Sequence, residues 1–270
     1  ITGERPLTLY IDKQEIVTLM TLGKNPELLV IGYLYNQGFI KKTEDLKSVQ
    51  VDWDIESAVV LTRGGISNLE KRLEKRTVTS GCGQGTVFGD MLEDLDKIKL
   101  NSPVLRQSSF YRLLKNIREY NEVYKKSGAV HGCALCKDEK IEIFIEDVGR
   151  HNAADAIAGY MLLEQIDGSN KLFYTTGRLT SEMVIKVAQM GIPILFSRAG
   201  ITKMGLELSQ KLGVTTISRA AGKHFLVYNG AETVIYDAKP SEKTNSRFNS
   251  SGGSEESPLH ERRRGSKLST

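Results

Sequence analysis

Cysteine is scarce in this sequence, with three residues among 270. An odd and small number excludes a framework of paired disulfides, so we expect a protein of the reducing cytoplasm. No apolar run reaches the roughly 20 residues of a membrane-spanning helix, and no signal-peptide pattern opens the chain. A net charge of +4 is too small to indicate a nucleic-acid surface. The remaining composition, 40% hydrophobic and 26% charged, is that of a globular protein bound to neither membrane nor nucleic acid.

The first part of the chain, residues 1–102, has a mixed pattern. Strand patterns occupy residues 7–11, 49–53 and 57–62, and an apolar-periodic helix is predicted over 28–37. Pro26 near the start of this helix and Gly38 at its end are typical helix boundaries. We therefore expect a small α+β domain that carries the Cys82 loop and ends near Ser102 and Pro103.

The second part, residues 103–239, opens with a long amphipathic helix predicted over 104–126 and then alternates between strands and helices. Strands are predicted at 141–145, 171–175, 192–197, 214–218 and 225–228, with helices at 151–163, 181–190 and 202–212. Such alternation indicates an α/β fold with a mostly parallel sheet and helices on both faces. Residues 240–270 have almost no apolar side chains, and we expect this tail to be disordered.

Cys82 is the residue whose surroundings are most unusual. It lies in a loop with three glycines within five residues, which cannot form a stable helix or strand. Basic residues just before it, including Lys75 and Arg76, favour the reactive thiolate. An accessible sulfur on such a loop suits a group that is handed between partners. The alternative interpretation is a glycine-rich turn that merely contains a cysteine.

A second candidate site combines His131 with the Cys-x-x-Cys pair Cys133 and Cys136. Zinc would use such ligands, and Cys82 could complete a set of four. However, structural zinc sites usually recruit two paired clusters. The zinc deaminase pattern also needs a glutamate where Cys133 stands. We therefore expect no resident metal and keep the zinc site as an alternative.

Polar residues gather at three strand ends, each followed by a helix start. At such ends open α/β sheets bind ligands, and backbone N–H groups favour anions. Three consecutive ends each carry an arginine, which indicates a pocket for phosphates, although helix capping and surface arginines are the alternatives. The residues assigned to this pocket are Arg150, Asn152, Gly177, Arg178, Ser197 and Arg198.

Five segments occur in an order that resembles the FdhD family, the formate dehydrogenase accessory sulfurtransferases. They are Thr-Ser-Gly-Cys-Gly at 79–83, Gly-Ala-Val-His at 128–131, Glu-Asp-Val-Gly-Arg-His-Asn-Ala-Ala-Asp at 146–155, Thr-Gly-Arg-Leu-Thr-Ser-Glu-Met-Val at 176–184 and Gly-Ile-Pro-Ile-Leu-Phe-Ser-Arg at 191–198. The resemblance implies homodimers with a three-layer αβα C-terminal domain like that of cytidine deaminases. It also implies sulfur transfer from a cysteine desulfurase to molybdenum bis(molybdopterin guanine dinucleotide), the cofactor that formate dehydrogenase requires.

By this resemblance, Cys82 matches the first cysteine of the family's Cys-Gly-x-Cys-Gly loop, the persulfide carrier. Gly85 stands where the family has its second loop cysteine, which puts a two-thiol mechanism in doubt. The family's cofactor-binding stretch corresponds approximately to Arg219, Ala220, Ala221, Gly222, Lys223, His224 and Phe225. Ala221 replaces a frequent arginine, so that Arg219 or Lys223 would supply the charge.

The sequence thus predicts a sulfur carrier in which Cys82 takes up a persulfide sulfur and delivers it to the molybdenum cofactor. His131 or His151 is the candidate for proton transfer, and the residues do not decide between them. Cys133 or Cys136 would be a resolving thiol or a buried, inert group. Two other classes of function stay open: a zinc-dependent deaminase-like hydrolase, and a chaperone that binds the cofactor without sulfur chemistry.

Overall fold

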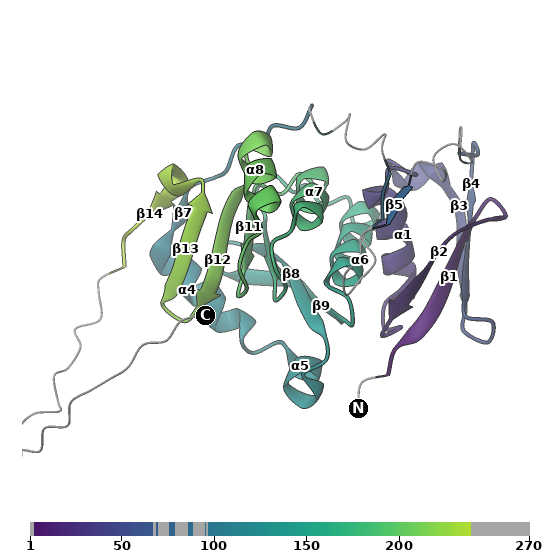
Figure 1. Ribbon diagram of the computed structural model, residues 1–270, viewed down its shortest axis with the longest axis horizontal. Helices are drawn as coiled ribbons and strands as arrows, with labels where there is room; N and C mark the ends of the chain where they lie inside the picture. The colour runs from purple at the N-terminus through teal and green to yellow at the C-terminus, as the bar shows by residue number, and fades with distance from the viewer. Residues whose placement is uncertain are drawn as a thin grey trace, which may run out of the picture. The chain divides into compact units, whose positions relative to one another are not determined.

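The computed structural model describes residues 3–66, 69, 76–78, 86–88, 95 and 97–238. Cys82 lies outside the described residues, as does the tail at 240–270, so the predictions about both remain predictions. Residues up to Ala238 belong to one compact unit that contains an N-terminal and a C-terminal sheet (Figure 1). Among the helices described, none has the length and apolar character needed to cross a membrane.

The N-terminal sheet has four strands in the order β2-β1-β4-β3. Every second residue of β1 is fully buried (Leu7, Leu9 and Ile11), which is the alternation of a strand with one covered face. The predicted strands and helix of this part are confirmed, whereas β2 was not predicted. The elements are β1 (Arg5–Ile11), β2 (Gln14–Thr21), α1 (Pro26–Asn36), η1 (Thr43–Asp45), β3 (Leu46–Asp52), β4 (Ser57–Thr62), and the antiparallel pair β5 (Arg76–Val78) and β6 (Thr86–Phe88).

The C-terminal sheet has six strands in the order β13-β12-β11-β10-β8-β9. Its strands are β8 (His131–Lys137), β9 (Lys140–Asp147), β10 (Leu172–Thr175), β11 (Ile194–Ser197), β12 (Thr215–Ala221) and β13 (His224–Asn229). A parallel pair, β7 (Leu105–Arg106) and β14 (Val234–Ile235), joins the two ends of this part, with η2 (Ala231–Thr233) just before β14.

The prediction of a mostly parallel sheet is wrong. Only β10–β11 and β11–β12 are parallel pairs in this sheet, and the pairs β8–β9, β8–β10 and β12–β13 are antiparallel. The physical reason is that β8–β9 and β12–β13 are hairpins closed by short turns, at Asp138 and Gly222, both with positive φ. The sheet is therefore mixed, with parallel strands only where helices make the crossovers.

Helices cover both faces of the C-terminal sheet, as predicted. Residues of α6 (Arg150–Leu163), α7 (Ser181–Gln189) and α8 (Lys203–Leu212) share a core with Cys133 and Leu135 of β8. Residues of α4 (Gln107–Ile117) share the other core with Ala134 and Cys136. Strand β8 thus alternates between two buried faces, which explains why its sequence shows no polar alternation.

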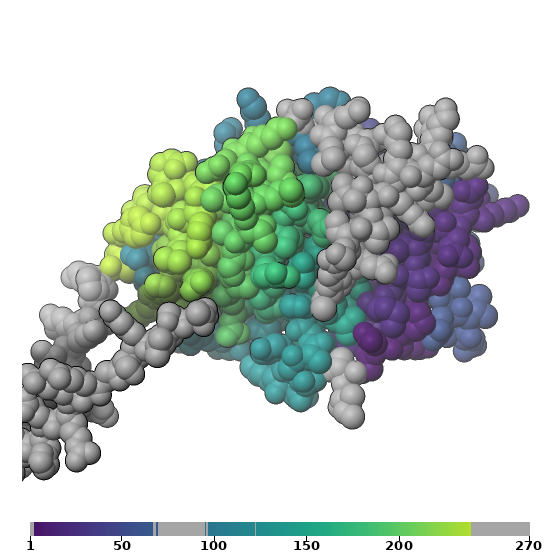
Figure 2. Space-filling model, viewed as in Figure 1, coloured from purple at the N-terminus to yellow at the C-terminus, as the bar shows by residue number. Residues whose placement is uncertain are grey.

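The single helix predicted over 104–126 is in fact two helices. Helix α4 ends at Ile117, and α5 (Glu122–Ser127) begins after a turn in which Asn121 has φ +17°. Tyr120 in this turn stacks on Phe144 of β9, with ring centroids 5.4 Å apart. The tertiary contact breaks an otherwise helical pattern, and α5 forms the lower edge of the C-terminal part in Figure 1 and Figure 2.

Helices α1 and α6 connect the two sheets by an unusually close crossing. A Cβ atom at Gly32 would lie 1.6 Å from the carbonyl oxygen of Asp155, and one at Gly159 would lie 2.1 Å from that of Leu28. Beside the crossing, Lys186 of α7 and Asn36 of α1 donate hydrogen bonds to Asp155, at 2.5 and 2.7 Å. The core is consequently continuous from β1 to α8.

Substituting Gly32 by alanine tests this crossing. Gly32→Ala should lower the free energy of unfolding by about 1–3 kcal/mol, because the backbones must separate to admit the methyl group. Gly64→Ala is the matched control, since nothing lies within 4 Å of its Cβ position, and its effect should stay within about 0.5 kcal/mol. Urea unfolding measures both, and equal stabilities of the two variants would contradict the close packing.

Candidate functional site

A cavity of about 310 Å³ opens at the carboxyl ends of β10, β11 and β12, on the side of the sheet covered by α4. These strands are the parallel ones. The sequence predicted a ligand pocket at the ends of β9, β10 and β11, and only the last two of these border the cavity. The cavity is lined by Leu114, Ile117, Arg118, Asn121, Tyr124, Lys125, Tyr174, Arg198, Ala220, Ala221 and Gly222.

The lining comes together because the ends of β11 and β12 meet the turn that follows α4. Arg198 follows β11 directly, and Ala220 and Ala221 end β12. Gly222 makes the turn into β13 with φ +64°, and a Cβ there would lie 3.1 Å from a guanidinium nitrogen of Arg118. Glycine at this position therefore satisfies both the turn and the approach of Arg118.

The charge of the cavity is positive. Arg118, Lys125 and Arg198 contribute cations, and none of the described lining residues is acidic. Arginine can hold a phosphate through two parallel hydrogen bonds, and lysine provides a point charge. This arrangement suits an anion, in particular a phosphate or pyrophosphate group.

Two buried polar atoms in the cavity wall have no hydrogen-bond partner among the described residues. They are Oδ1 of Asn121, a residue 5% exposed, and the hydroxyl of Tyr174, a residue 1% exposed. Burial raises the pKa of Tyr174 to about 12, although Arg198 and Asn121 lower it in part. Neither residue forms a well-aligned hydrogen bond to the hydroxyl. The phenol is therefore neutral and able to donate. Buried polar groups normally have partners, so a polar ligand would complete these two.

A second polar cluster lies on the opposite face of the sheet, where α6 and α7 begin. The Nε2 atom of His151 is 3.1 Å from a carboxylate oxygen of Glu182, although the two are not in line for a hydrogen bond. Burial lowers the pKa of His151 to about 2, and Lys186 and Arg150 add to this effect. His151 is thus a neutral imidazole in a dry site.

His131 is half-buried at the start of β8, with Nδ1 3.3 Å from the hydroxyl of Thr176. Burial, helped by Arg150, lowers its pKa. Neither His131 nor His151 lines the cavity described above. Their assignment to proton transfer stays a prediction.

Asn152, assigned above to cofactor binding, has its amide engaged within the protein. Its Nδ2 donates to the carbonyl oxygen of Met20 at 2.6 Å and to Asp147 at 3.0 Å. Asp147 also accepts from the hydroxyl of Thr21 at 2.5 Å, and burial raises its pKa despite these bonds. This pair therefore attaches the end of β2 to the start of α6.

The other predicted pocket residues are divided between the interior and the surface. Arg150 is buried, and a Cβ at Gly177 would lie 2.5 Å from its Cδ. Ser197 donates to the carbonyl oxygen of Gly177 at 2.5 Å, which holds two strand-end loops together. Arg178 is exposed and outside the cavity lining. Of the three arginines predicted to converge, only Arg198 lines the cavity.

Within the stretch 219–225, the structure brings Ala220, Ala221 and Gly222 to the cavity. Arg219, with φ +51°, and Lys223 and His224 are exposed without lining it. Phe225 is half-buried and packs edge-to-face on Phe110, with ring centroids 5.1 Å apart. The positive charge near Ala221 therefore comes from Arg118 and Arg198. It does not come from Arg219 or Lys223, which were predicted to replace the arginine of the family.

Cys133 and Cys136 are buried on opposite faces of β8, because residues three apart in a strand point in opposite directions. They cannot bind one metal ion together, which argues against the zinc hydrolase. Burial raises the pKa of Cys133 to about 12 and also raises that of Cys136. Both thiols therefore stay protonated at neutral pH.

Comparison with known proteins places these features in a family. The family model described as FdhD/NarQ matches residues 2–235. The chain belongs to the FdhD/NarQ family. It is similar to proteins named sulfur carrier protein FdhD from Bacillus pumilus (32% identity, 84% of this chain, 87% of the relative) and Wolinella succinogenes (32%, 84% and 80%). It also matches the crystal structure of a protein named as a formate dehydrogenase accessory protein, from Desulfotalea psychrophila, with a TM-score of 0.70 and 28% identity over 86% of this chain and 90% of that one.

Seven lining residues of this FdhD/NarQ protein were not predicted, and four of them carry polar groups and lie close together in the chain: Arg118, Asn121, Tyr124 and Lys125. All four lie within the segment that the sequence suggested to be one helix, where they looked like an exposed polar face. The weak signal was a run of polar residues, 115–122, interrupted only by Ile117 and Tyr120. Tyr174, the remaining unassigned polar wall residue, looked like an ordinary core residue of a strand.

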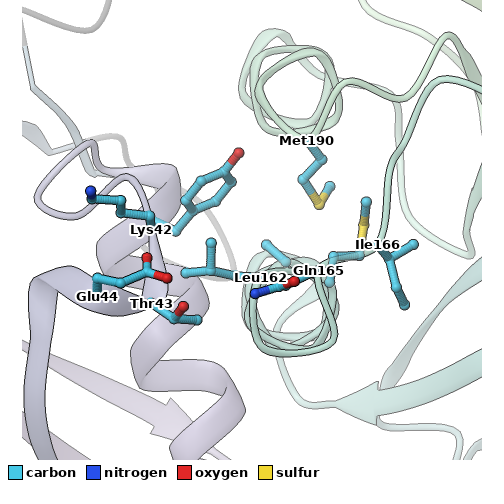
Figure 3. A pocket seen from close by; sticks show the side chains of 10 residues that line it. Lys42, Thr43, Glu44, Leu162, Gln165, Ile166 and Met190 are labelled. Atoms are coloured by element: carbon cyan, nitrogen blue, oxygen red, sulfur yellow. The ribbon is translucent and has the colours of Figure 1, made fainter.

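A second pocket, of about 190 Å³, lies between α1 and the end of α6 (Figure 3). Lys42, Thr43 and Glu44 approach it from one side, and Leu162, Gln165 and Ile166 from the other, with Met190 beside them. Its walls are largely apolar and its rim carries both signs of charge. It is less suited to a polyanion than the cavity at the strand ends.

Thiol labelling tests the burial of the two strand cysteines. A Cys82→Ser variant should take up no alkylating reagent in its native state, because Cys133 and Cys136 are both inaccessible and protonated. Both should react after unfolding in urea, which is the control for reagent activity. Mass spectrometry of the labelled protein gives the count, and rapid native labelling of either residue would contradict their placement.

Proposed function

We propose that this FdhD/NarQ protein is a sulfur carrier that takes a persulfide sulfur from a cysteine desulfurase and transfers it to the molybdenum bis(molybdopterin guanine dinucleotide) cofactor of formate dehydrogenase. The observation that carries the proposal is the cationic cavity at the strand ends, in a chain related to proteins named as sulfur carriers. In this proposal the cofactor is a substrate, and the chain acts as a sulfurtransferase that works as a homodimer.

The sulfur step uses Cys82. Its thiolate attacks the terminal sulfur of the donor persulfide, the donor S–S bond breaks, and the donor thiolate leaves and takes up a proton. Cys82 then holds the sulfur as a persulfide, with no net oxidation or reduction. Its return to a thiol on delivery of the sulfur as sulfide consumes two electrons, which we assign to a thiol reductant.

The cavity would hold a nucleotide end of the cofactor. Arg118, Lys125 and Arg198 supply charged donors for its phosphates. Asn121 Oδ1 accepts and the Tyr174 hydroxyl donates, so the base edge of a nucleotide would satisfy both buried atoms. All of these residues line the cavity in the protein without a ligand, and pockets of this kind are usually largely preformed.

The proposed likeness to cytidine deaminases concerns the C-terminal layers only. A hairpin of β8 and β9, followed by α6, β10 and α7, gives a mixed sheet with helices on both faces. The cluster of Arg150, His151 and Glu182 lies where α6 and α7 begin, and it lacks the paired thiolates that a zinc enzyme would use there. We therefore favour sulfur transfer over metal hydrolysis.

Intact-mass spectrometry tests the sulfur step. After incubation with a cysteine desulfurase and cysteine, the protein should gain one sulfur atom that a thiol reductant removes, and Cys82→Ser should abolish the gain. Cys133→Ala is the matched control and should leave the gain unchanged. A reductant-labile sulfur that persists in Cys82→Ser would assign the carrier to another thiol. Active formate dehydrogenase assembled with Cys82→Ser would favour the chaperone function instead.

Calorimetry with guanosine diphosphate tests the cavity. Arg198→Ala and Arg118→Ala should each weaken binding by about 1.5–3 kcal/mol, the worth of a hydrogen bond to a charged group. Arg178→Ala is the comparison, because this arginine follows the neighbouring strand but does not line the cavity, and its effect should be smaller. Binding that depends on Arg178 and ignores the other two would place the nucleotide elsewhere.

A further inference from the structure

Helix α5 forms one wall of the cavity but has little stability of its own. It contains six residues, and its N-cap residue, Asn121, makes no side-chain capping bond. Isolated helices shorter than roughly 12 residues are marginal in water. Its position must therefore come from contacts with the rest of the protein.

Glu146 of β9 provides those contacts. One carboxylate oxygen accepts from the backbone N–H of Val123 and the other from that of Tyr124, both at 2.9 Å. A carboxylate at a helix start is favoured by the unpaired N–H groups and by the helix dipole. Two residues earlier on the same face of β9, Phe144 stacks on Tyr120. Strand β9 thus holds this segment at two points.

The segment held in this way carries three lining residues: Asn121, Tyr124 and Lys125. The backbone N–H of Lys125 donates to the carbonyl oxygen of Asn121 at 3.0 Å, the first helical bond after the Glu146 cap. The Nζ atom of Lys125 donates a hydrogen bond to the carbonyl oxygen of Glu119, in the turn after α4, at 3.4 Å. The direction of this cation is therefore set by where α5 begins.

We propose that Glu146 is a positioning residue of the cavity, which fixes the start of α5 so that Lys125 faces a bound phosphate. Glu146 does not line the cavity, and both its oxygens are used by backbone N–H groups, so it acts through α5 rather than on the ligand. This inference rests on the proposed binding of a nucleotide in the same cavity. It gives a role to the first residue of the 146–155 segment, for which the sequence alone predicts none.

A double-mutant cycle tests the coupling, with guanosine diphosphate as the probe. Glu146→Gln keeps the side-chain size but replaces one acceptor by a donor that faces a backbone N–H. It should weaken binding about tenfold in the otherwise unchanged protein and less than about twofold in a Lys125→Gln background. Glu139→Gln is the matched control, because Glu139 pairs with Arg112 at the surface, 2.7 Å away, and its substitution should not change affinity.

Hydrogen exchange of the ligand-free proteins gives a readout independent of binding. The amides of Val123 and Tyr124 should exchange faster in Glu146→Gln and at the original rate in Glu139→Gln. Equal loss of affinity in both Lys125 backgrounds, or unchanged exchange at these amides, would overturn the positioning role. If the unchanged protein binds no guanosine diphosphate, the proposed nucleotide site fails, and the exchange result still decides whether Glu146 holds α5.

Discussion

The crossing of α1 and α6 is the constraint on which the arrangement of the two sheets depends. Carbonyl oxygens of Leu28 and Asp155 occupy the space that side chains at Gly159 and Gly32 would need. Because the helices are so close, the carboxylate of Asp155 contacts Asn36 of α1 and Lys186 of α7 at once. Asp155 and Lys186 form an ion pair that is buried from solvent. A buried charge without its partner is costly, so this pair requires the helices to stay close. The close approach and the ion pair therefore depend on each other.

The end of β9 transmits this arrangement to the candidate site. Glu146 and Asp147 are adjacent, so their side chains point to opposite faces of the sheet. Asp147 binds Thr21 and Asn152 on the side of the N-terminal sheet, whereas Glu146 caps α5 on the side of the cavity. The acidic pair that opens the 146–155 segment thus has two structural roles. Much of that segment supports the site without touching the cavity.

The sequence predicts an element well when the pattern that determines it lies within that element, and poorly when distant residues determine it. Helix α6 and strand β4 were predicted almost to their ends because their periodicity and boundary residues are contained in the segment. Strand β8 was not predicted, and its cysteines were weighed only as an alternative metal site, because a strand buried on both faces has no alternation to reveal it. The turn between α4 and α5 depends on Phe144 and Glu146, which follow more than 20 residues later in the chain. Arg198 could be predicted from its position after a strand. Arg118 and Lys125 could not, because the turn between α4 and α5 brings them to the cavity.

The two faces of the C-terminal sheet impose different electrostatic conditions on the residues that the sequence predicts to form one pocket. On the α6 side, burial keeps His151 neutral and leaves Arg150 in the interior beside Gly177. A doubly charged phosphate would have to lose its hydration to enter such a site, at a large cost in free energy. On the α4 side, Arg118, Lys125 and Arg198 remain in contact with solvent. They can attract a phosphate before it is desolvated, and Tyr174 and Asn121 offer buried polar atoms only deeper in the wall. The sheet itself therefore separates a dry structural cluster from the surface that can receive an anion.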